Sequence, residues 1–170
     1  MRLYFCPECR SASASEDWCP ACGLLRNSQA KKYVEKLLET ILLPDPTRVG
    51  MAIDVLTKWL HEPRTIVPLV LLLEGDVDSH RFVMAARGLG WLCDRAAIPA
   101  LRLLLFDPAK PFVARVAAAQ ALGQLGGETA KLALQQATTD ERSSVAQAAV
   151  QALTDMARSK EITDENSRIK

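Results

Sequence analysis

The chain has 170 residues, of which 49% are hydrophobic and 24% are charged. These values are ordinary for a globular protein with a sizeable core, and no apolar run approaches the roughly 18 residues of a membrane span. The 21 Lys and Arg residues balance 20 Asp and Glu residues, so the net charge excludes a strongly basic nucleic-acid-binding surface of the usual kind. Because the N-terminus lacks the apolar core of a secretion signal, we expect a cytoplasmic protein that makes no contact with a membrane.

Four of the five cysteines form two Cys-x-x-Cys pairs, CPEC at 6–9 and CPAC at 19–22. Two such pairs at short separation can close a tetrahedral thiolate site. Zinc is the expected ion because four thiolates leave no open coordination position, and iron is the alternative metal. The pattern predicts a structural Zn²⁺ site within residues 1–26, where the metal supplies much of the folding energy. The predicted ligands are Cys6, Cys9, Cys19 and Cys22.

From about Asn27 onward the chain is rich in Leu, Ala and Val, and its motifs recur at steps of 31 to 33 residues. Residues 118–122 match residues 149–153 at a step of 31, and residues 85–90 match residues 118–123 at a step of 33. Aspartates that are able to cap helices recur at similar steps, at Asp45, Asp76, Asp107 and Asp140. In the Leu-rich stretches a step of 31 links Ile41, Leu72, Leu103 and Leu134. The recurrence predicts an array of helix pairs, each an Ala-rich helix followed by a Leu-rich helix.

We predict eight helices, of which the first, over 28–43, is amphipathic and opens the array. The other seven make about three and a half repeats and span 47–60, 64–74, 79–92, 95–106, 111–125, 127–138 and 141–158. The repeat domain therefore covers 27–158. The remaining residues, 159–170, are polar without an apolar period, and we expect them to form a disordered tail.

Two family resemblances follow from these motifs. The paired CPxC knuckles of residues 1–26 resemble the zinc ribbon family. Residues 44–157 resemble HEAT-like repeats of the short type that phycobilisome lyase subunits contain, through Asp107, Arg115, Ala118-Ala119, Leu122-Gly123 and Leu125-Gly126. The resemblances imply an all-α fold: a short α-solenoid of helix pairs with a small N-terminal zinc ribbon. They also imply that the second helices line a concave, protein-binding face.

Three arginines are candidate partner-binding residues on the second helices. Arg64 and Arg95 lie 31 residues apart at the start of Leu-rich helices, and Arg102 follows within the second of them. Together they form either a basic strip on the binding face or separate solvated residues that Glu62 and Asp94 partly balance.

The sequence contains no phosphate loop, no dinucleotide-binding fingerprint and no nucleophile–histidine pattern. The fifth cysteine, Cys93, is expected to be a small buried residue near a helix end. We therefore predict that the protein is not an enzyme and that it acts as a scaffold for a protein partner. The alternative is nucleic-acid binding by the zinc ribbon and the solenoid, against which the balanced charge argues. A third hypothesis, a lyase-like role that places a prosthetic group on a target protein, rests on the repeat type alone.

Overall fold

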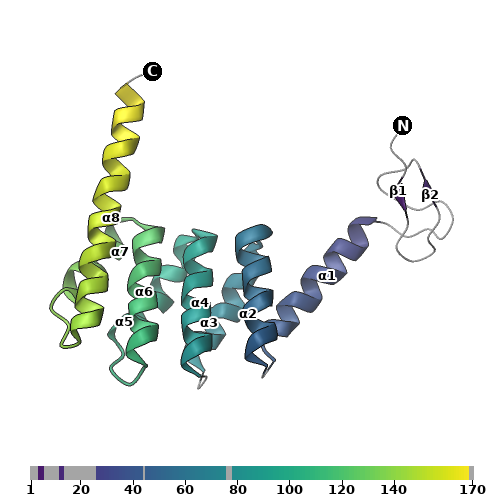
Figure 1. Ribbon diagram of the computed structural model, residues 1–170, viewed down its shortest axis with the longest axis horizontal. Coiled ribbons are helices and arrows are strands. Elements are labelled where there is room, and N and C mark those ends of the chain that lie inside the picture. The colour runs from purple at the N-terminus through teal and green to yellow at the C-terminus, as the bar shows by residue number, and fades with distance from the viewer. Residues whose placement is uncertain (1–3, 6–11, 14–25, 44, 76–77, 169–170) are drawn as a thin grey trace.

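The computed structural model describes residues 4–5, 12–13, 26–43, 45–75 and 78–168. The helices in these ranges form two layers (Figure 1). The first helices of the repeats stand side by side in one layer: α2 (Pro46–Asp54), α4 (Ser79–Leu92), α6 (Phe112–Leu125) and α8 (Ser143–Arg168). The second helices form the layer behind: α3 (Ile66–Glu74), α5 (Ile98–Phe106) and α7 (Glu128–Ala137). With α1 (Arg26–Ile41) packed on α2 at one end of the row, the predicted α-solenoid is confirmed for the repeat domain.

Near the N-terminus two short strands, β1 (Tyr4–Phe5) and β2 (Ala12–Ser13), pair antiparallel. Tyr4 lies opposite Ser13, and Phe5 lies opposite Ala12. The four cysteines that we predict as metal ligands lie outside the described residues. The zinc ribbon therefore stays a prediction.

The predicted helices correspond to those in the structure, with three local differences in helix type. The turns η2 (Pro63–Thr65) and η3 (Arg95–Ala97) are 3-10 turns that lead into α3 and α5, and η1 (Val55–Trp59) is a π-helical turn that follows α2. None of the helices in the part of the chain that the structure describes has the length and apolarity needed to cross a bilayer.

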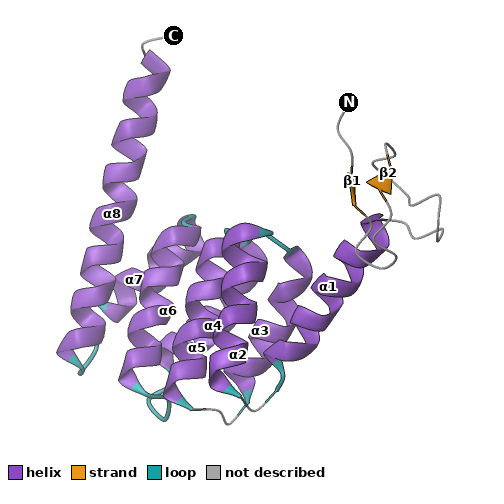
Figure 2. Ribbon diagram, turned by 45° about the vertical axis from the view of Figure 1, so that its right-hand side comes forward, coloured by secondary structure: helices purple, strands orange, loops and turns teal. Residues whose placement is uncertain are grey.

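The end of the last helix differs from our expectation. Helix α8 continues to Arg168, through most of the segment that we expected to be disordered (Figure 2). The segment 159–168 contains no Gly or Pro, the residues that most strongly disfavour a helix interior. Its polarity therefore did not indicate a helix end.

At least one of the regularly spaced aspartates caps a helix as predicted. Asp45 accepts hydrogen bonds from the backbone N–H groups of Thr47 and Arg48, which begin α2. Asp76 lies outside the described residues. At α4 the Asp78 carboxylate accepts a hydrogen bond from the Arg81 N–H. At its other end α4 stops at Cys93, which has a left-handed φ of 53° and is exposed, contrary to our expectation of a buried residue.

The first helices approach one another closely at two glycines. A Cβ atom added to Gly123 of α6 would lie 2.8 Å from the Cβ of Ala152 in α8. One added to Gly90 of α4 would lie 3.1 Å from the Cα of Ala121 in α6. Because real Cβ contacts are longer than the first of these distances and rarely as short as the second, the spacing of the first layer depends on the missing side chains.

The buried ion pair of Arg115 and Asp140 joins three elements. Arg115 Nε donates to the carbonyl oxygen of Leu105, at 2.8 Å, and Nη2 donates to the Asp140 carboxylate. The two charged side chains are only 9% and 11% exposed. Arg115 therefore ties α6 to the end of α5 and to the loop before α8. Burial of the pair is tolerated because both charged groups make further hydrogen bonds.

The close approach at Gly123 predicts that Gly123→Ala and Gly50→Ala have opposite effects on the free energy of unfolding. At Gly50 of α2 the added Cβ would meet only Met84 Cε, at 3.7 Å, so Gly50→Ala gains helix propensity, about 0.5–1 kcal/mol of stability. Gly123→Ala has the same gain in helix propensity, but its added methyl group must push α8 away. Overpacking of this kind costs about 1–3 kcal/mol of stability. We expect Gly123→Ala to lower the free energy of unfolding in urea titrations and Gly50→Ala to raise it. Equal stabilisation by both substitutions would contradict the glycine contact.

Removing the charge of Asp140 leaves the Arg115 guanidinium buried without a counter-ion. We expect Asp140→Asn to lower the free energy of unfolding by about 3–5 kcal/mol. The control is Asp155→Asn, whose ion pair with Arg158 is more than half exposed on both sides and contributes about 0–1 kcal/mol. Thermal unfolding of the two variants at neutral pH makes the comparison, and similar midpoints would show that the buried pair is dispensable.

Candidate protein-binding surfaces

The outer face of the second helices carries exposed leucines at equivalent positions. Leu71, Leu103 and Leu132 are 51%, 72% and 53% exposed. Each immediately precedes two buried residues that face the first layer, namely Leu72 and Leu73 on α3, Leu104 and Leu105 on α5, and Ala133 and Leu134 on α7. The three exposed leucines, which we call the leucine row, thus cross three consecutive repeats.

The leucine row corrects the register that we predicted for the Leu-rich helices. A uniform step of 31 matches Leu103 with Leu72 and Leu134, which are both buried, whereas Leu103 is exposed. The steps in the structure are 32, from Leu71 to Leu103, and 29, from Leu103 to Leu132. The shorter step follows from the tight turn between α6 and α7, where Gly126 and Gly127 have φ of 65° and 88°.

A shallow hollow of about 580 Å³ adjoins the leucine row on α5. Its walls are Pro99, Arg102, Leu103, Phe106 and Asp107. The hollow places the predicted Arg102 beside exposed apolar groups, an arrangement that is common in protein interfaces.

The other two predicted arginines lie at non-equivalent positions. Glu62 and Asp94 cap η2 and η3 at a step of 32, so Arg64 corresponds to Ala96 and not to Arg95. The Arg64 guanidinium binds the Glu62 carboxylate through Nε at 2.8 Å and Nη2 at 3.0 Å. This hydrogen bonding lowers the pKa of the Glu62 carboxyl and raises the pKa of Arg64. The charge of Arg64 is therefore balanced locally, and Arg64 and Arg95 occupy different positions in their turns. The basic strip stays a prediction.

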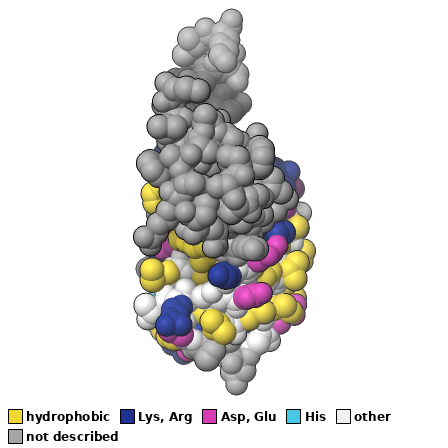
Figure 3. Space-filling model, turned by 90° about the vertical axis from the view of Figure 1, so that its right-hand side faces the viewer, with side chains coloured by type: hydrophobic (Ala, Val, Ile, Leu, Met, Phe, Trp, Pro, Cys, Tyr) yellow, Lys and Arg dark blue, Asp and Glu magenta, His cyan; other side chains and the backbone are white. Residues whose placement is uncertain are grey.

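Charges of both signs mix on the N-terminal end of the array. Where side chains are coloured in Figure 3, Lys and Arg lie among Asp, Glu and hydrophobic groups. This part of the surface has no continuous basic field of the kind that phosphate contacts require.

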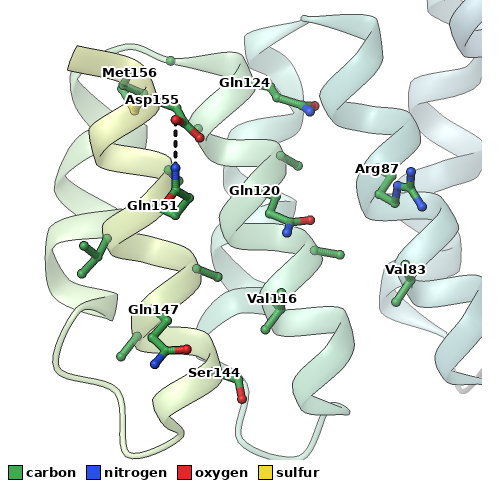
Figure 4. A pocket seen from close by; sticks show the side chains of 18 of the residues that line it. Val83, Arg87, Val116, Gln120, Gln124, Ser144, Gln147, Gln151, Asp155 and Met156 are labelled. Carbon is green, nitrogen blue, oxygen red and sulfur yellow. Dashed lines mark hydrogen bonds between the residues drawn. The ribbon is translucent and has the colours of Figure 1, made fainter. Parts of the chain in front are cut away.

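The outer face of the first helices contains a larger groove that our sequence analysis missed. It lies over α4, α6 and α8 and has a volume of about 1770 Å³ (Figure 4). Four glutamines line it, Gln120 and Gln124 on α6 and Gln147 and Gln151 on α8, so we call it the glutamine groove. Although the resemblance placed the binding face on the second helices, the larger hollow is on the first helices.

At the α4 side of the groove, two cations lie near the Trp91 ring. Lys58 Nζ is 3.9 Å from the ring centroid and Arg87 Cζ is 5.1 Å from it. Lys58 also pairs with Asp54 at 3.1 Å, whereas Arg87 has no carboxylate partner among the described residues. Arg87 therefore presents an unbalanced positive charge to the groove.

The sequence did contain a signal for this groove. Arg87, Gln120 and Gln151 follow one another at steps of 33 and 31, which are the steps that align the Ala-rich helices. Each residue alone is typical of a solvated helix surface, and only the combination of register and exposure shows that they share one hollow.

Comparison with known proteins identifies the repeat. Residues 69–154 match the family model of HEAT repeats. The structure of the complex of CpcE and CpcF of phycocyanin lyase from Nostoc sp. PCC7120 is similar, with 26% sequence identity and a TM-score of 0.58. The match covers 89% of this chain and 61% of that chain, so this chain spans about three fifths of its neighbour's length. A comparison with curated proteins finds no match.

This similarity corrects one prediction. We predicted that the protein is not an enzyme because no catalytic pattern is present, but the similar structure is that of a lyase complex. A motif search detects chemistry whose side chains have a recognisable spacing. An activity that depends on surfaces assembled from several repeats has no such spacing.

Proposed function

Because the chain belongs to the HEAT-repeat family, we propose that it is the protein-binding subunit of a lyase-like system. In this role it holds a target protein while a prosthetic group is attached to that target. The leucine row is the observation that carries the proposal. It gives three consecutive repeats one apolar surface that nothing in the described part of the chain covers.

The exposed area supplies the binding energy. Burial of a fully exposed leucine side chain contributes about 1.5–3 kcal/mol, and Leu103 is 72% exposed on the central helix of the row. A solenoid presents such positions at regular spacing on a rigid face. Phe106 and Arg102 beside the row add an aromatic ring and a cation, which are frequent in the central residues of interfaces.

Similarity to a two-protein lyase complex supports the same role. Nucleic-acid binding, our alternative hypothesis, gains no such support. Arg64 is paired with Glu62, and the remaining two arginines of the predicted strip provide few phosphate contacts.

We expect the double variant Leu71→Ser/Leu103→Ser to lose the partner. Affinity capture from host lysate with the wild-type chain, followed by mass spectrometry, identifies the partner, and titration then gives the Kd. Loss of two interfacial leucines at more than 1 kcal/mol each weakens binding about 30-fold or more. The control is Leu42→Ser, which changes a leucine in the turn after α1 that is 57% exposed. We expect this variant to bind as the wild type does.

The lyase-like part of the proposal is tested by a separate measurement. We expect the partner, after incubation with the chain and lysate cofactors, to gain the mass of a prosthetic group in intact mass spectrometry. A partner that binds through the leucine row without any gain of mass would refute the lyase-like role and leave the protein-binding role standing.

We also propose that Cys6, Cys9, Cys19 and Cys22 bind a structural Zn²⁺. The donor set fits this ion because four thiolates in two Cys-x-x-Cys pairs match its preferred coordination. In the sequence the first pair falls between β1 and β2, which pair antiparallel with each other. When bound, the ion would supply folding energy to residues 1–26.

Metal analysis tests the zinc site. We expect about one zinc per chain in the wild type and loss of the metal in Cys9→Ser and Cys22→Ser. Cys93→Ser is the control, because Cys93 is an exposed residue at the end of α4. Helical circular dichroism is expected to survive metal removal, since the array has its own core. Iron in place of zinc, or no metal at all, would refute the assignment.

A further inference from the structure

We propose that the glutamine groove binds an extended polypeptide segment that carries a carboxylate side chain. The groove lies on the first helices and the leucine row lies on the second helices. The proposal therefore does not depend on the function proposed above.

The size and composition of the groove favour a polypeptide. Its volume of about 1770 Å³ exceeds the range of about 300–1,000 Å³ that is usual for small-molecule sites. Among its 23 described lining residues, Arg87 and Asp155 alone are charged, although 24% of the whole chain is charged. Such depletion of charge is typical of the core of a protein interface and not of an ordinary solvated face.

The glutamines indicate that the segment is extended. A side-chain amide offers both a donor and an acceptor, as a peptide group does. Gln120 and Gln124 are four residues apart on α6, which is about 6 Å along a helix axis. Alternate residues of an extended chain are about 6.6–6.8 Å apart, so an extended chain that runs along α6 meets both amides with peptide groups. Gln147 and Gln151 repeat this spacing on α8.

A helical ligand does not use these amides, because the backbone groups of a helix are already bonded to one another. The side-chain amides of Gln120, Gln124 and Gln147 make no hydrogen bond within the described part of the chain, so they are available to a ligand. Gln151 donates to Asp155 at 3.0 Å and retains its amide oxygen as an acceptor.

The charge of the segment follows from the charges in the groove. Asp155 is balanced by Arg158 at 3.6 Å as well as by Gln151. Arg87 has no carboxylate partner in the described residues, and its guanidinium lies against the Trp91 ring. The groove therefore complements a segment with a carboxylate at the α4 side. One unbalanced cation is too few for a nucleic acid.

The test starts from a displayed library of random 12-residue peptides, selected on the full chain. Each peptide carries a central proline, which disfavours helices. We expect the selected peptides to be enriched in Asp or Glu. Fluorescence polarisation with a labelled selected peptide then gives Kd values for the variants. Gln120→Ala/Gln147→Ala is expected to weaken binding tenfold or more. The control Gln135→Ala/Gln136→Ala, which changes two exposed glutamines of α7 outside the groove, is expected to leave the Kd unchanged.

Two further measurements separate charge recognition from backbone recognition. Arg87→Gln, which keeps much of the side-chain stem, should weaken an acidic peptide about tenfold and leave its Glu→Gln analogue unaffected. N-methylation of alternate backbone amides of the peptide should also weaken binding. Selection of no peptide, binding that ignores the glutamine and arginine variants, or tighter binding of helical peptides without the proline would each overturn the proposal. Unchanged thermal midpoints of the variants exclude unfolding as the cause of a loss.

Discussion

The distance between neighbouring first helices is set where only glycine fits. At Gly90 and Gly123 even a methyl group would contact the next helix at 3.1 Å or less, so α4, α6 and α8 lie as close as their backbones permit. The outer face of the layer is consequently continuous from one helix to the next. Residues at equivalent positions, such as Arg87, Gln120 and Gln151, then line the same groove. The groove is a consequence of helix spacing and not of a special loop.

The close-packed layer is held in register by polar contacts at the loops. Arg115 connects α6 with the end of α5 and, through Asp140, with the loop before α8. Lys110 performs a similar role one repeat earlier, where its ammonium group donates to the Gly75 carbonyl oxygen at 3.1 Å. Apolar packing alone is not directional, whereas these contacts specify which loop faces which helix. The helices can therefore consist largely of Ala and Leu and still adopt one register.

The repeat was predictable because helix packing leaves a periodic pattern of small residues. Steps of 33 and 31 in the Ala-rich stretches correctly align α4, α6 and α8. The Leu-rich stretches misled us, because leucine occupies both buried and exposed positions in them. Leu72 is buried and the adjacent Leu71 is exposed, yet nothing in a run of leucines distinguishes the two. Loop lengths, such as the short turn at Gly126 and Gly127, decided the register of the second helices. The four N-terminal cysteines lie outside the described residues, so their role as ligands rests on spacing.

The two outer faces of the array differ in the kind of selectivity that they can provide. In our proposal the leucine row contributes binding energy from apolar burial, which depends little on the direction or sequence of the partner. In our proposal the glutamine groove contributes hydrogen bonds and one charge. Hydrogen bonds are directional, and a mismatched ligand is penalised because polar groups left unpaired have lost their solvation. If one target engages both faces, the first contact raises the effective concentration of the second segment. A rigid solenoid is suited to this arrangement because the spacing between the faces is fixed by the thickness of its two layers.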